Sequence, residues 1–213
     1  MRMGRNPERD ARAMAARKQK ILQHSFKVFS TRGIDGVSMN DVAKACKIGC
    51  ATLYRHYTTK PALAAAVAVW AWENRILAQI RKARLEGETA AAQLASYLDL
   101  FLELYRKQPE ALRFDLYFRV YARNEHLPED QAMASAGAVS ELANIFSGVY
   151  AAAGQDGTVK TEMGEKKMFS FILDTLLYAC SRSSAAFSYT EGSDSEGELV
   201  LLKDTILRTL QTA

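Results

Sequence analysis

The sequence holds few of the residues from which catalytic and metal centres are built. Three histidines and three cysteines are spread along the chain: His24, His56, His126, Cys46, Cys50 and Cys180. Their spacing matches neither a zinc site nor a disulfide framework. No nucleophile–base pair accompanies the histidines, so an enzyme is disfavoured. We expect no catalytic residue, no metal and no cofactor.

Long apolar runs are also absent. The longest, residues 62–72, falls short of the ~18 residues that a membrane span needs. The first residues, MRMGRNPE, are charged and lack the apolar core of a signal peptide. The scarcity of cysteine is typical of a reducing compartment. The sequence therefore predicts a cytoplasmic protein without a membrane partner.

Charge is distributed unevenly between the two parts of the chain. Residues 1–60 contain 13 Lys and Arg against 4 Asp and Glu, a net charge of +9, whereas residues 61–213 carry −5. A basic segment of this kind is typical of contact with a polyanion, although a solubilising basic tail gives the same count. Charge alone does not separate the two readings.

Helix formers dominate the sequence, and no alternating β-branched run suggests a strand. We predict an all-α fold of about nine helices: an N-terminal three-helix helix-turn-helix domain followed by a larger helical bundle for ligand binding and dimerisation. The expected domains are residues 1–60, with a basic arm over 1–11, and residues 61–213. The expected helices cover residues 13–32, 39–46, 50–57, 62–84, 89–107, 110–124, 128–153, 162–188 and 196–211.

Residues 38–57 have the pattern of a helix-turn-helix, which is a short helix, a tight turn and a second short helix. Ser38 and Asp41 form a capping-box pattern at the start of the first helix. Small or apolar side chains, among them Val42 and Leu53, let the two helices cross closely. In this motif the second helix enters the major groove of DNA. Side chains able to bind phosphates or bases occupy outward positions: Asn40, Thr52, Tyr54, Arg55, His56 and Lys60.

These residues carry a family resemblance. The stretch from Val37 to Ala43, the run Thr52-Leu53-Tyr54-Arg55-His56-Tyr57 with Lys60 after it, and the preceding helix that ends at Gly33 resemble the DNA-binding domain of the TetR (tetracycline-repressor) family of bacterial regulators. The close similarity covers residues 17–65. Two positions depart from the family pattern. Lys47 replaces a turn glycine, so it must adopt unusual backbone angles, and Gly49 replaces a capping serine.

The resemblance implies a role for each matching residue. Thr52, Tyr54, His56 and Lys60 resemble the phosphate contacts of the family, and Met39 opens the bracing helix beside Asn40. Asn40 and Arg55 are our candidates for base readout because amides pair with adenine and guanidinium groups with guanine. The full expected DNA-binding set is Ser38, Met39, Asn40, Cys50, Ala51, Thr52, Tyr54, Arg55, His56 and Lys60.

The resemblance also implies a homodimer that binds operator DNA and is released by a small molecule. We expect the effector to be largely apolar or aromatic and to contact a set of aromatic residues and one acid: Phe101, Tyr105, Phe114, Tyr117, Phe118, Tyr121, Phe146, Tyr150, Phe171 and Asp174. Core packing is the competing interpretation of these aromatics. The last two long helices are expected to form the dimer interface, with Leu199, Leu202, Ile206 and Leu210 as one stripe and Phe171, Thr175, Ala179 and Arg182 as another. A DNA-binding protein controlled by a partner, or by no ligand, is the alternative function.

Overall fold

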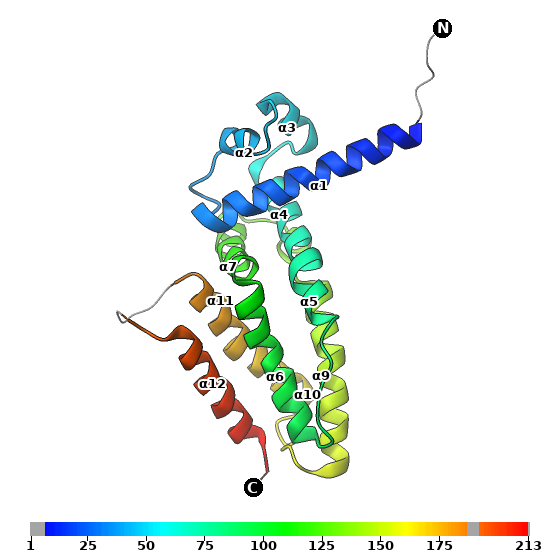
Figure 1. Ribbon diagram of the computed structural model, residues 1–213, viewed down its shortest axis with the longest axis vertical. Coiled ribbons are helices and arrows are strands. Elements are labelled where there is room, and N and C mark those ends of the chain that lie inside the picture. The colour runs from blue at the N-terminus through cyan, green and yellow to red at the C-terminus, as the bar shows by residue number, and fades with distance from the viewer. Residues whose placement is uncertain (1–6, 187–191, 213) are drawn as a thin grey trace. The chain divides into compact units, whose positions relative to one another are not determined.

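The computed structural model describes residues 7–186 and 192–212, and it confirms the predicted all-α fold (Figure 1). Within these ranges the only strand-like pairing is a single bridge between Val159 and Gln211. α4, η1 and α5 form one continuous helix, as do α10, η2 and α11, so the described residues form ten helices. The chain divides into two compact units. The first contains Met1–Ala71 and Tyr117–Ala134, and the second contains Trp72–Leu116 and Ser135–Ala213.

The first unit is built around a long N-terminal helix. α1 (Pro7–Arg32) packs against α2 (Met39–Ala45) and α4 (Lys60–Ala71), and α3 (Cys50–His56) packs against α2. Residues 1–6 of the predicted arm lie outside the described residues, and the rest of the arm belongs to α1. The helix begins at Pro7, six residues before the predicted start.

Large apolar side chains of three helices form the core of this unit. The α1 stripe of Ile21, Phe26 and Phe29 is at most 2% exposed, and Leu53 and Leu63 are fully buried. The ring of Phe26 lies 5.5 Å from that of Trp70. α1 ends at Arg32, and Gly33 follows it with a φ of 74°, which suits a residue without a side chain.

α4 continues without a break into η1 (Trp72–Leu77), which has wide π-helical turns, and then into α5 (Ala78–Ile80). The helix predicted for residues 62–84 therefore spans Lys60 to Ile80. Gly87 lies in the connection that follows this helix and has a φ of 110°. A Cβ atom there would lie 2.3 Å from the Cβ of Ala92, so glycine is required at this position.

The second unit is a bundle arranged around α6 (Ala90–Lys107). α9 (Ala136–Asp156) and α12 (Ser195–Leu210) both pack on α6, as does α11 (Tyr178–Ser184). α10 (Glu165–Ile172) and η2 (Leu173–Leu177) precede α11 in the same continuous helix. α7 (Pro109–Asn124) contributes its first half to this unit. None of the described helices is long and apolar enough to cross a membrane.

One predicted helix is wrong. Residues 128–153 form two helices, α8 (Glu129–Ala132) and α9, separated by residues 133–135. Met133 leaves the helical conformation, with φ −88° and ψ 43°. No proline lies at this break, and Gly137 is inside α9, so the local sequence contains no breaker of the usual kind.

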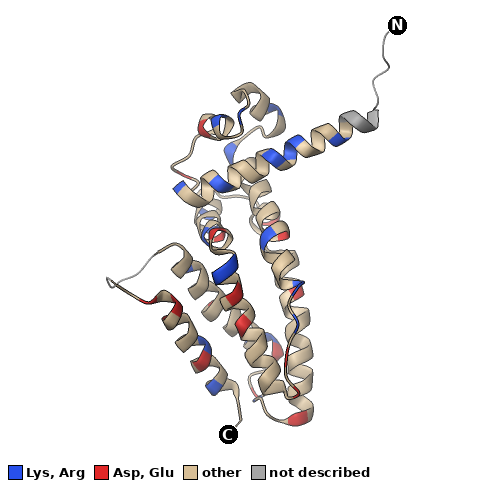
Figure 2. Ribbon diagram, in the orientation of Figure 1, with Lys and Arg blue, Asp and Glu red and all other residues tan. Residues whose placement is uncertain are grey.

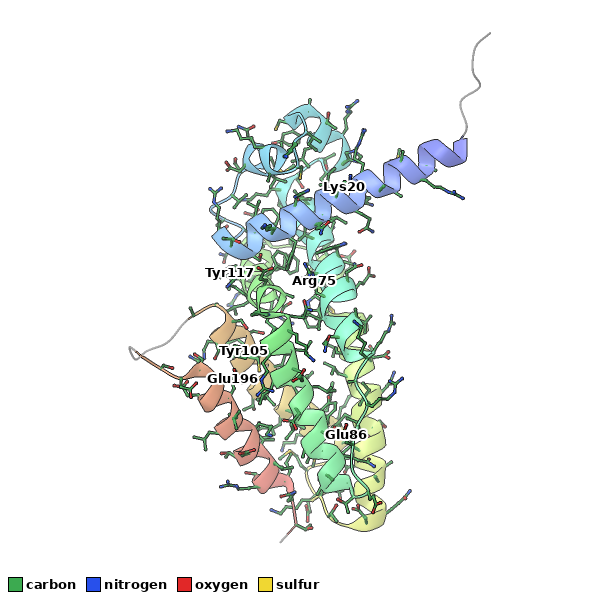
Figure 3. The ribbon with its side chains drawn as sticks, in the orientation of Figure 1. Lys20, Arg75, Glu86, Tyr105, Tyr117 and Glu196 are labelled. Atoms are coloured by element: carbon green, nitrogen blue, oxygen red, sulfur yellow. The ribbon has the colours of Figure 1, made fainter. Side chains whose placement is uncertain are left out.

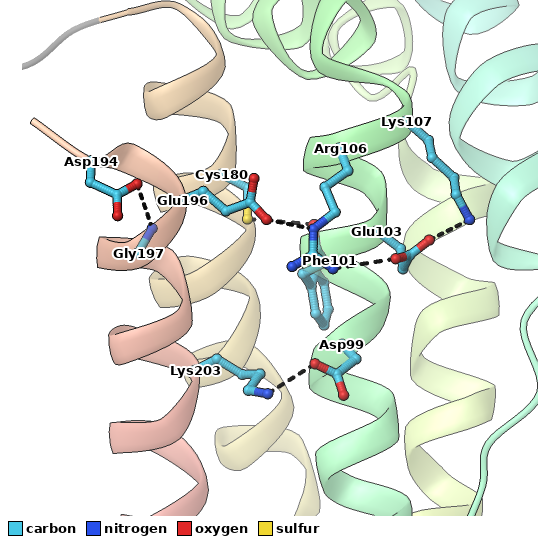
Figure 4. Close-up of polar contacts among 10 residues, drawn as sticks. All are labelled: Asp99, Phe101, Glu103, Arg106, Lys107, Cys180, Asp194, Glu196, Gly197 and Lys203. Atoms are coloured by element: carbon cyan, nitrogen blue, oxygen red, sulfur yellow. Dashed lines mark hydrogen bonds and ion pairs between the residues drawn. The ribbon is translucent and has the colours of Figure 1, made fainter.

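Ion pairs join α6 to α12 across the surface of the bundle (Figure 4). Lys203 Nζ lies 3.0 Å from Asp99 Oδ1, and Arg106 Nε lies 2.7 Å from Glu196 Oε1. Asp194 caps α12 by accepting a hydrogen bond from the Gly197 amide at 3.0 Å. Exposed pairs of this kind contribute little free energy, and the register of the two helices depends mainly on the apolar face between them.

Candidate nucleic-acid interface

The predicted capping box at the start of α2 is present. Ser38 Oγ accepts a hydrogen bond from the Asp41 amide at 3.1 Å, and the Ser38 amide donates to Asp41 Oδ2 at 3.0 Å. Ser38 Oγ also donates to Asp41 Oδ2 at 2.6 Å. The two hydrogen bonds that the Ser38 hydroxyl and amide donate to the carboxylate lower the pKa of Asp41. The carboxylate is therefore kept ionised at the positive end of α2, which favours the helix.

The turn between α2 and α3 has a lysine at the position where the family pattern has glycine. Lys47 adopts a left-handed φ of 55°, as its place in the turn predicts. The Ile48 amide donates to the Ala43 carbonyl at 3.0 Å, which holds the turn closed. Gly49 precedes α3 with extended backbone angles and offers no side-chain cap.

α3 presents one apolar and one polar side. Leu53 is fully buried against α2, whereas Ala51, Tyr54 and Arg55 are exposed, with Tyr54 at 47%. Arg55 Nη2 donates to Thr52 Oγ1 at 3.2 Å, so the guanidinium lies along the outer face of the helix. The outer face is the one that a major groove would meet.

Cys50, Thr52 and His56 are half-buried along the edges of this face, and Asn40 is exposed at the first turn of α2. Met39 is buried at 7% exposure and is directed into the core. The structure thus brings most of the predicted set together on α2 and α3, but it removes Met39 from the surface.

Lys60 is held within the protein. Its ammonium group donates to the carbonyl oxygens of Ile34 at 3.1 Å, Asp35 at 3.3 Å and Val37 at 3.2 Å. It also lies over the ring of Tyr121, 5.4 Å from the centroid. The expected role of this lysine as a phosphate contact has no support in this arrangement.

Sequence reasoning missed the basic side of α1. Every residue from 11 to 20 is exposed, and the segment contains Arg12, Arg17, Lys18 and Lys20 but no acid. In the described part of the chain none of the four forms an ion pair. The Lys and Arg positions along α1 are blue in the ribbon of Figure 2, and Lys20 is labelled in Figure 3.

A hollow of about 290 Å³ lies between α1 and the turn that precedes α3. Arg17, Lys20, Cys46 and Ile48 are among the residues that line it, and we call it the α1 hollow. Burial raises the pKa of Cys46, so its thiol is protonated and neutral. The hollow is therefore lined by two cations, Arg17 and Lys20, and by uncharged residues.

The stretch of sequence that contains α3 lacks acidic residues. Between Asp41 and Glu73 the sequence contains no aspartate or glutamate. An anionic partner that approaches α3 therefore meets no repulsive carboxylate from this stretch.

The predicted effector residues do not form one group. Tyr117, Phe118 and Tyr121 belong to the first unit, and the other seven belong to the second. Phe101, Phe114 and Phe146 are at most 1% exposed, whereas Phe171 and Asp174 are exposed. Tyr105 and Tyr150 are half-buried; burial, and then Glu196, raises the pKa of Tyr105 (Figure 3). Burial is also the main reason that the pKa of Tyr121 is raised to about 12.

Aromatic rings in the second unit pack against one another. The ring of Phe146 lies 5.4 Å from Tyr97, 5.8 Å from Phe169 and 6.3 Å from Tyr150. Tyr97 OH donates to the Leu142 carbonyl at 3.2 Å, and Tyr150 OH donates to the Thr161 carbonyl at 2.9 Å. These contacts give the rings a role in the core.

Elsewhere in this unit, a hollow of about 670 Å³ lies between the α5 end and α6. Charged residues of both signs line it, including Lys82, Arg84, Glu86, Asp99, Glu103 and Lys107. Its volume is within the range of small-molecule sites, but its lining differs from the aromatic set that the sequence suggested.

The expected interface stripe on α12 is directed inward. Leu199, Ile206 and Leu210 are at most 3% exposed because this face of α12 packs on α6 within the same chain. The exposed apolar residues of the last helices are Leu201 at 64%, Tyr178 at 56% and Phe171 at 37% exposure. Of these three, only Phe171 belongs to a predicted interface stripe.

Comparison with known proteins agrees with the geometry of α2 and α3. Residues 21–67 match the family described as bacterial regulatory proteins, tetR family. An HTH-type transcriptional regulator of Staphylococcus aureus (strain USA300) is 42% identical over 43 residues, which are 20% of this chain and 23% of that protein. The chain thus matches less than a quarter of the length of these curated relatives.

Solved structures resemble the chain over nearly its whole length. A bacterial regulatory protein in the tetR family from Rhodococcus RHA1 aligns with a TM-score of 0.68 and 16% identity, covering 92% of this chain and 98% of that one. A putative TetR-family regulator from Rhodococcus sp. aligns with a TM-score of 0.66 and 22% identity, covering 90% of this chain and 99% of that one. AibR, solved with isovaleryl coenzyme A and operator DNA, aligns with a TM-score of 0.61 and 17% identity, covering 92% of this chain and 98% of that one. Residues 21–67 thus match the tetR family of bacterial regulatory proteins, and the chain as a whole shares the fold of solved TetR-family structures.

Proposed function

We propose that the protein is a homodimeric transcriptional repressor that binds operator DNA through α3 and is released by a small-molecule ligand. The observation that carries the DNA-binding part is the outer face of α3, where Tyr54 and Arg55 are exposed above a fully buried Leu53. A helix anchored on one side and polar on the other fits the width of the major groove.

Base readout falls to Asn40 and Arg55, the exposed amide and guanidinium at the start of α2 and on α3. Thr52, Tyr54 and His56 carry hydroxyl and imidazole groups suited to phosphates on either side of the groove. The exposed cations of α1 extend this surface, and Arg17 and Lys20 beside the α1 hollow are the residues that we assign to the DNA backbone.

Dimerisation is supported by the outward face of the last helices. Phe171, Tyr178 and Leu201 expose apolar surface although they lie on well-packed helices. A twofold interface buries the same patch on both subunits, which suits three large exposed side chains on neighbouring elements. Two subunits would then present two recognition helices to two half-sites.

Ligand release requires that the effector bind more tightly to the conformation that does not fit the operator. The second unit is the proposed location of the effector site, as in the expectation from sequence. AibR was solved with both isovaleryl coenzyme A and operator DNA, which makes that acyl thioester a suitable first probe for this chain.

The experiment that tests the proposal begins with selection of bound sequences from a randomised duplex pool at low ionic strength. The wild-type protein should enrich a motif with twofold symmetry. Tyr54→Ala should weaken binding to all sequences by a similar factor, whereas Arg55→Ala should relax preference at one base pair. Enrichment of no motif would refute the proposed function.

A ligand-independent DNA-binding protein is the second candidate. The tight packing of Phe101, Phe114 and Phe146, at most 1% exposed, favours it, because these rings act as core. Titration of the operator complex with isovaleryl coenzyme A and other acyl thioesters separates the two candidates. Release by one of them supports the repressor, and retention under all of them favours the alternative.

A further inference from the structure

We propose that Lys60 is a positioning residue of the DNA-binding unit, which fixes the segment from Ile34 to Val37 and does not itself bind a DNA phosphate. The proposal rests on the proposed function, since the effect of Lys60 is exerted through α2 and α3 on bound DNA. It differs from the role that the family resemblance implies for this lysine.

The argument starts from the hydrogen-bonding capacity of the side chain. An ammonium group has three N–H donors and no acceptor. Lys60 Nζ has three carbonyl partners, at 3.1 Å, 3.3 Å and 3.2 Å, all from one short segment of chain. No donor is left over for a phosphate oxygen.

The segment that Lys60 binds lies directly before α2. Gly33 follows α1, Ile34 and Val37 are each 1% exposed, and Ser38 then caps α2. Three carbonyl groups of this segment thus converge on one cation more than twenty residues later in the chain. The position of the Ser38 cap, and with it the start of α2, depends on this anchor.

Tyr121 closes another side of the ammonium group. Its ring centroid lies 5.4 Å from Lys60 Nζ, and the residue is 1% exposed. An aromatic face attracts a cation and shields it from solvent. Movement of Lys60 toward DNA would abandon this ring as well as the three carbonyl groups.

The salt dependence of DNA binding distinguishes a phosphate contact from a positioning residue. A lysine that binds a phosphate displaces condensed counterions, and each such contact contributes about 0.9 to the slope of log affinity against log salt. A lysine whose donors are all used by carbonyl groups of the protein makes no phosphate contact, so its removal takes no such contact from the slope. Its loss lowers affinity by a similar factor at every salt concentration.

The test compares Lys60→Met with Lys20→Met. Both variants remove one positive charge and keep an unbranched side chain, but Lys20 is exposed beside the α1 hollow. Dissociation constants for the selected operator are measured by fluorescence anisotropy over a series of KCl concentrations, at a temperature where circular dichroism shows the variants to be folded.

For Lys60→Met we expect about a tenfold or larger rise in Kd, equivalent to about 1.4 kcal/mol, with an unchanged salt slope. For Lys20→Met we expect a shallower slope. A slope reduced by about 0.9 per subunit in Lys60→Met would overturn the proposal in favour of a phosphate contact. A lower melting temperature with unchanged Kd would show a purely structural role and would overturn it equally.

A measurement on the wild-type protein keeps the proposal testable if Lys60→Met does not fold. The ammonium group of a lysine held by three carbonyl groups exchanges its protons slowly, so Lys60 should give a ¹⁵N-detected signal in the free protein. We expect the signal to persist with operator DNA and to lack coupling to ³¹P. A phosphorus coupling at Lys60 would refute the proposal, whereas failure of the wild type to bind any duplex would refute the proposed function instead.

Discussion

Replacing Arg17 and Lys20 together by glutamine tests whether α1 belongs to the DNA interface. Both residues line the α1 hollow, and both are exposed on a segment without acids. If each binds one phosphate in each subunit, the dimer loses four contacts. The salt slope then falls by about 3.6, since each contact contributes about 0.9.

This change in slope has a large effect on measured affinities. Between 50 and 200 mM KCl, the wild-type affinity should fall by about a hundredfold more than the affinity of the double variant, as a slope difference of about 3.6 over a fourfold change in salt requires. Anisotropy titrations of labelled operator at four or five salt concentrations give both slopes directly. Because α1 is exposed over this segment, the free energy of unfolding should change little.

The matched control is Arg81→Gln with Lys82→Gln. These residues are also one arginine and one lysine, both exposed, but they follow α5 in the second unit. The control should reproduce the wild-type slope. Equal slopes for all three proteins would contradict the assignment of α1 to the interface and would leave DNA contact to α2 and α3 alone.

Three further predictions follow from the local geometry. Ser38→Ala, which removes the acceptor for the Asp41 amide, should lower the free energy of unfolding by about 1 kcal/mol, and Ser38→Gly by only a few tenths; equal losses in urea denaturation would argue against the cap. Tyr57→Phe removes a buried hydroxyl that has no hydrogen-bond partner within the described part of the chain, so it should raise stability by about 1 kcal/mol without weakening DNA binding; a loss of stability would reveal a partner for the hydroxyl. Tyr178→Asp places a charge on the exposed apolar face of the last helices and should convert the dimer to a monomer in sedimentation velocity, whereas Met163→Asp, also at an exposed apolar residue, should not; a Tyr178→Asp dimer would move the interface elsewhere.

Local signals in the sequence were sufficient for the helix-turn-helix. Ser38 and Asp41 have a spacing that specifies a capping box, and Lys47 occupies a turn position whose backbone angles follow from the motif. Both features are present in the structure. They depend on neighbouring residues only, which is why sequence alone could indicate them.

Lys60 shows where such reasoning ends. An ammonium group seeks oxygen atoms, and carbonyl and phosphate oxygens are equivalent partners when only the sequence is known. The choice depends on how the chain brings residues 34–37 back to the start of α4, which is a tertiary contact. The basic side of α1 was missed for a related reason, since the predicted helix over residues 13–32 does not show which of its side chains remain exposed once the chain has folded.

The helices of the second unit show the same limit in a different form. Periodicity identified a stripe of α12, made of Leu199, Leu202, Ile206 and Leu210, but a stripe does not say whether it meets the same chain or another one. The structure uses it against α6. The break at residues 133–135 could not be foreseen either, because neither proline nor glycine lies there to mark it.

The discontinuous composition of the first unit bears on the engineering of chimeric regulators. A gene fusion that joins residues 1–71 to a foreign sensor would exclude Tyr117–Ala134, which form part of the same compact unit. The graft would then lack the aromatic ring over Lys60. A functional exchange of sensors in this protein therefore has to transplant two separate stretches of sequence, or supply a compatible replacement for the second.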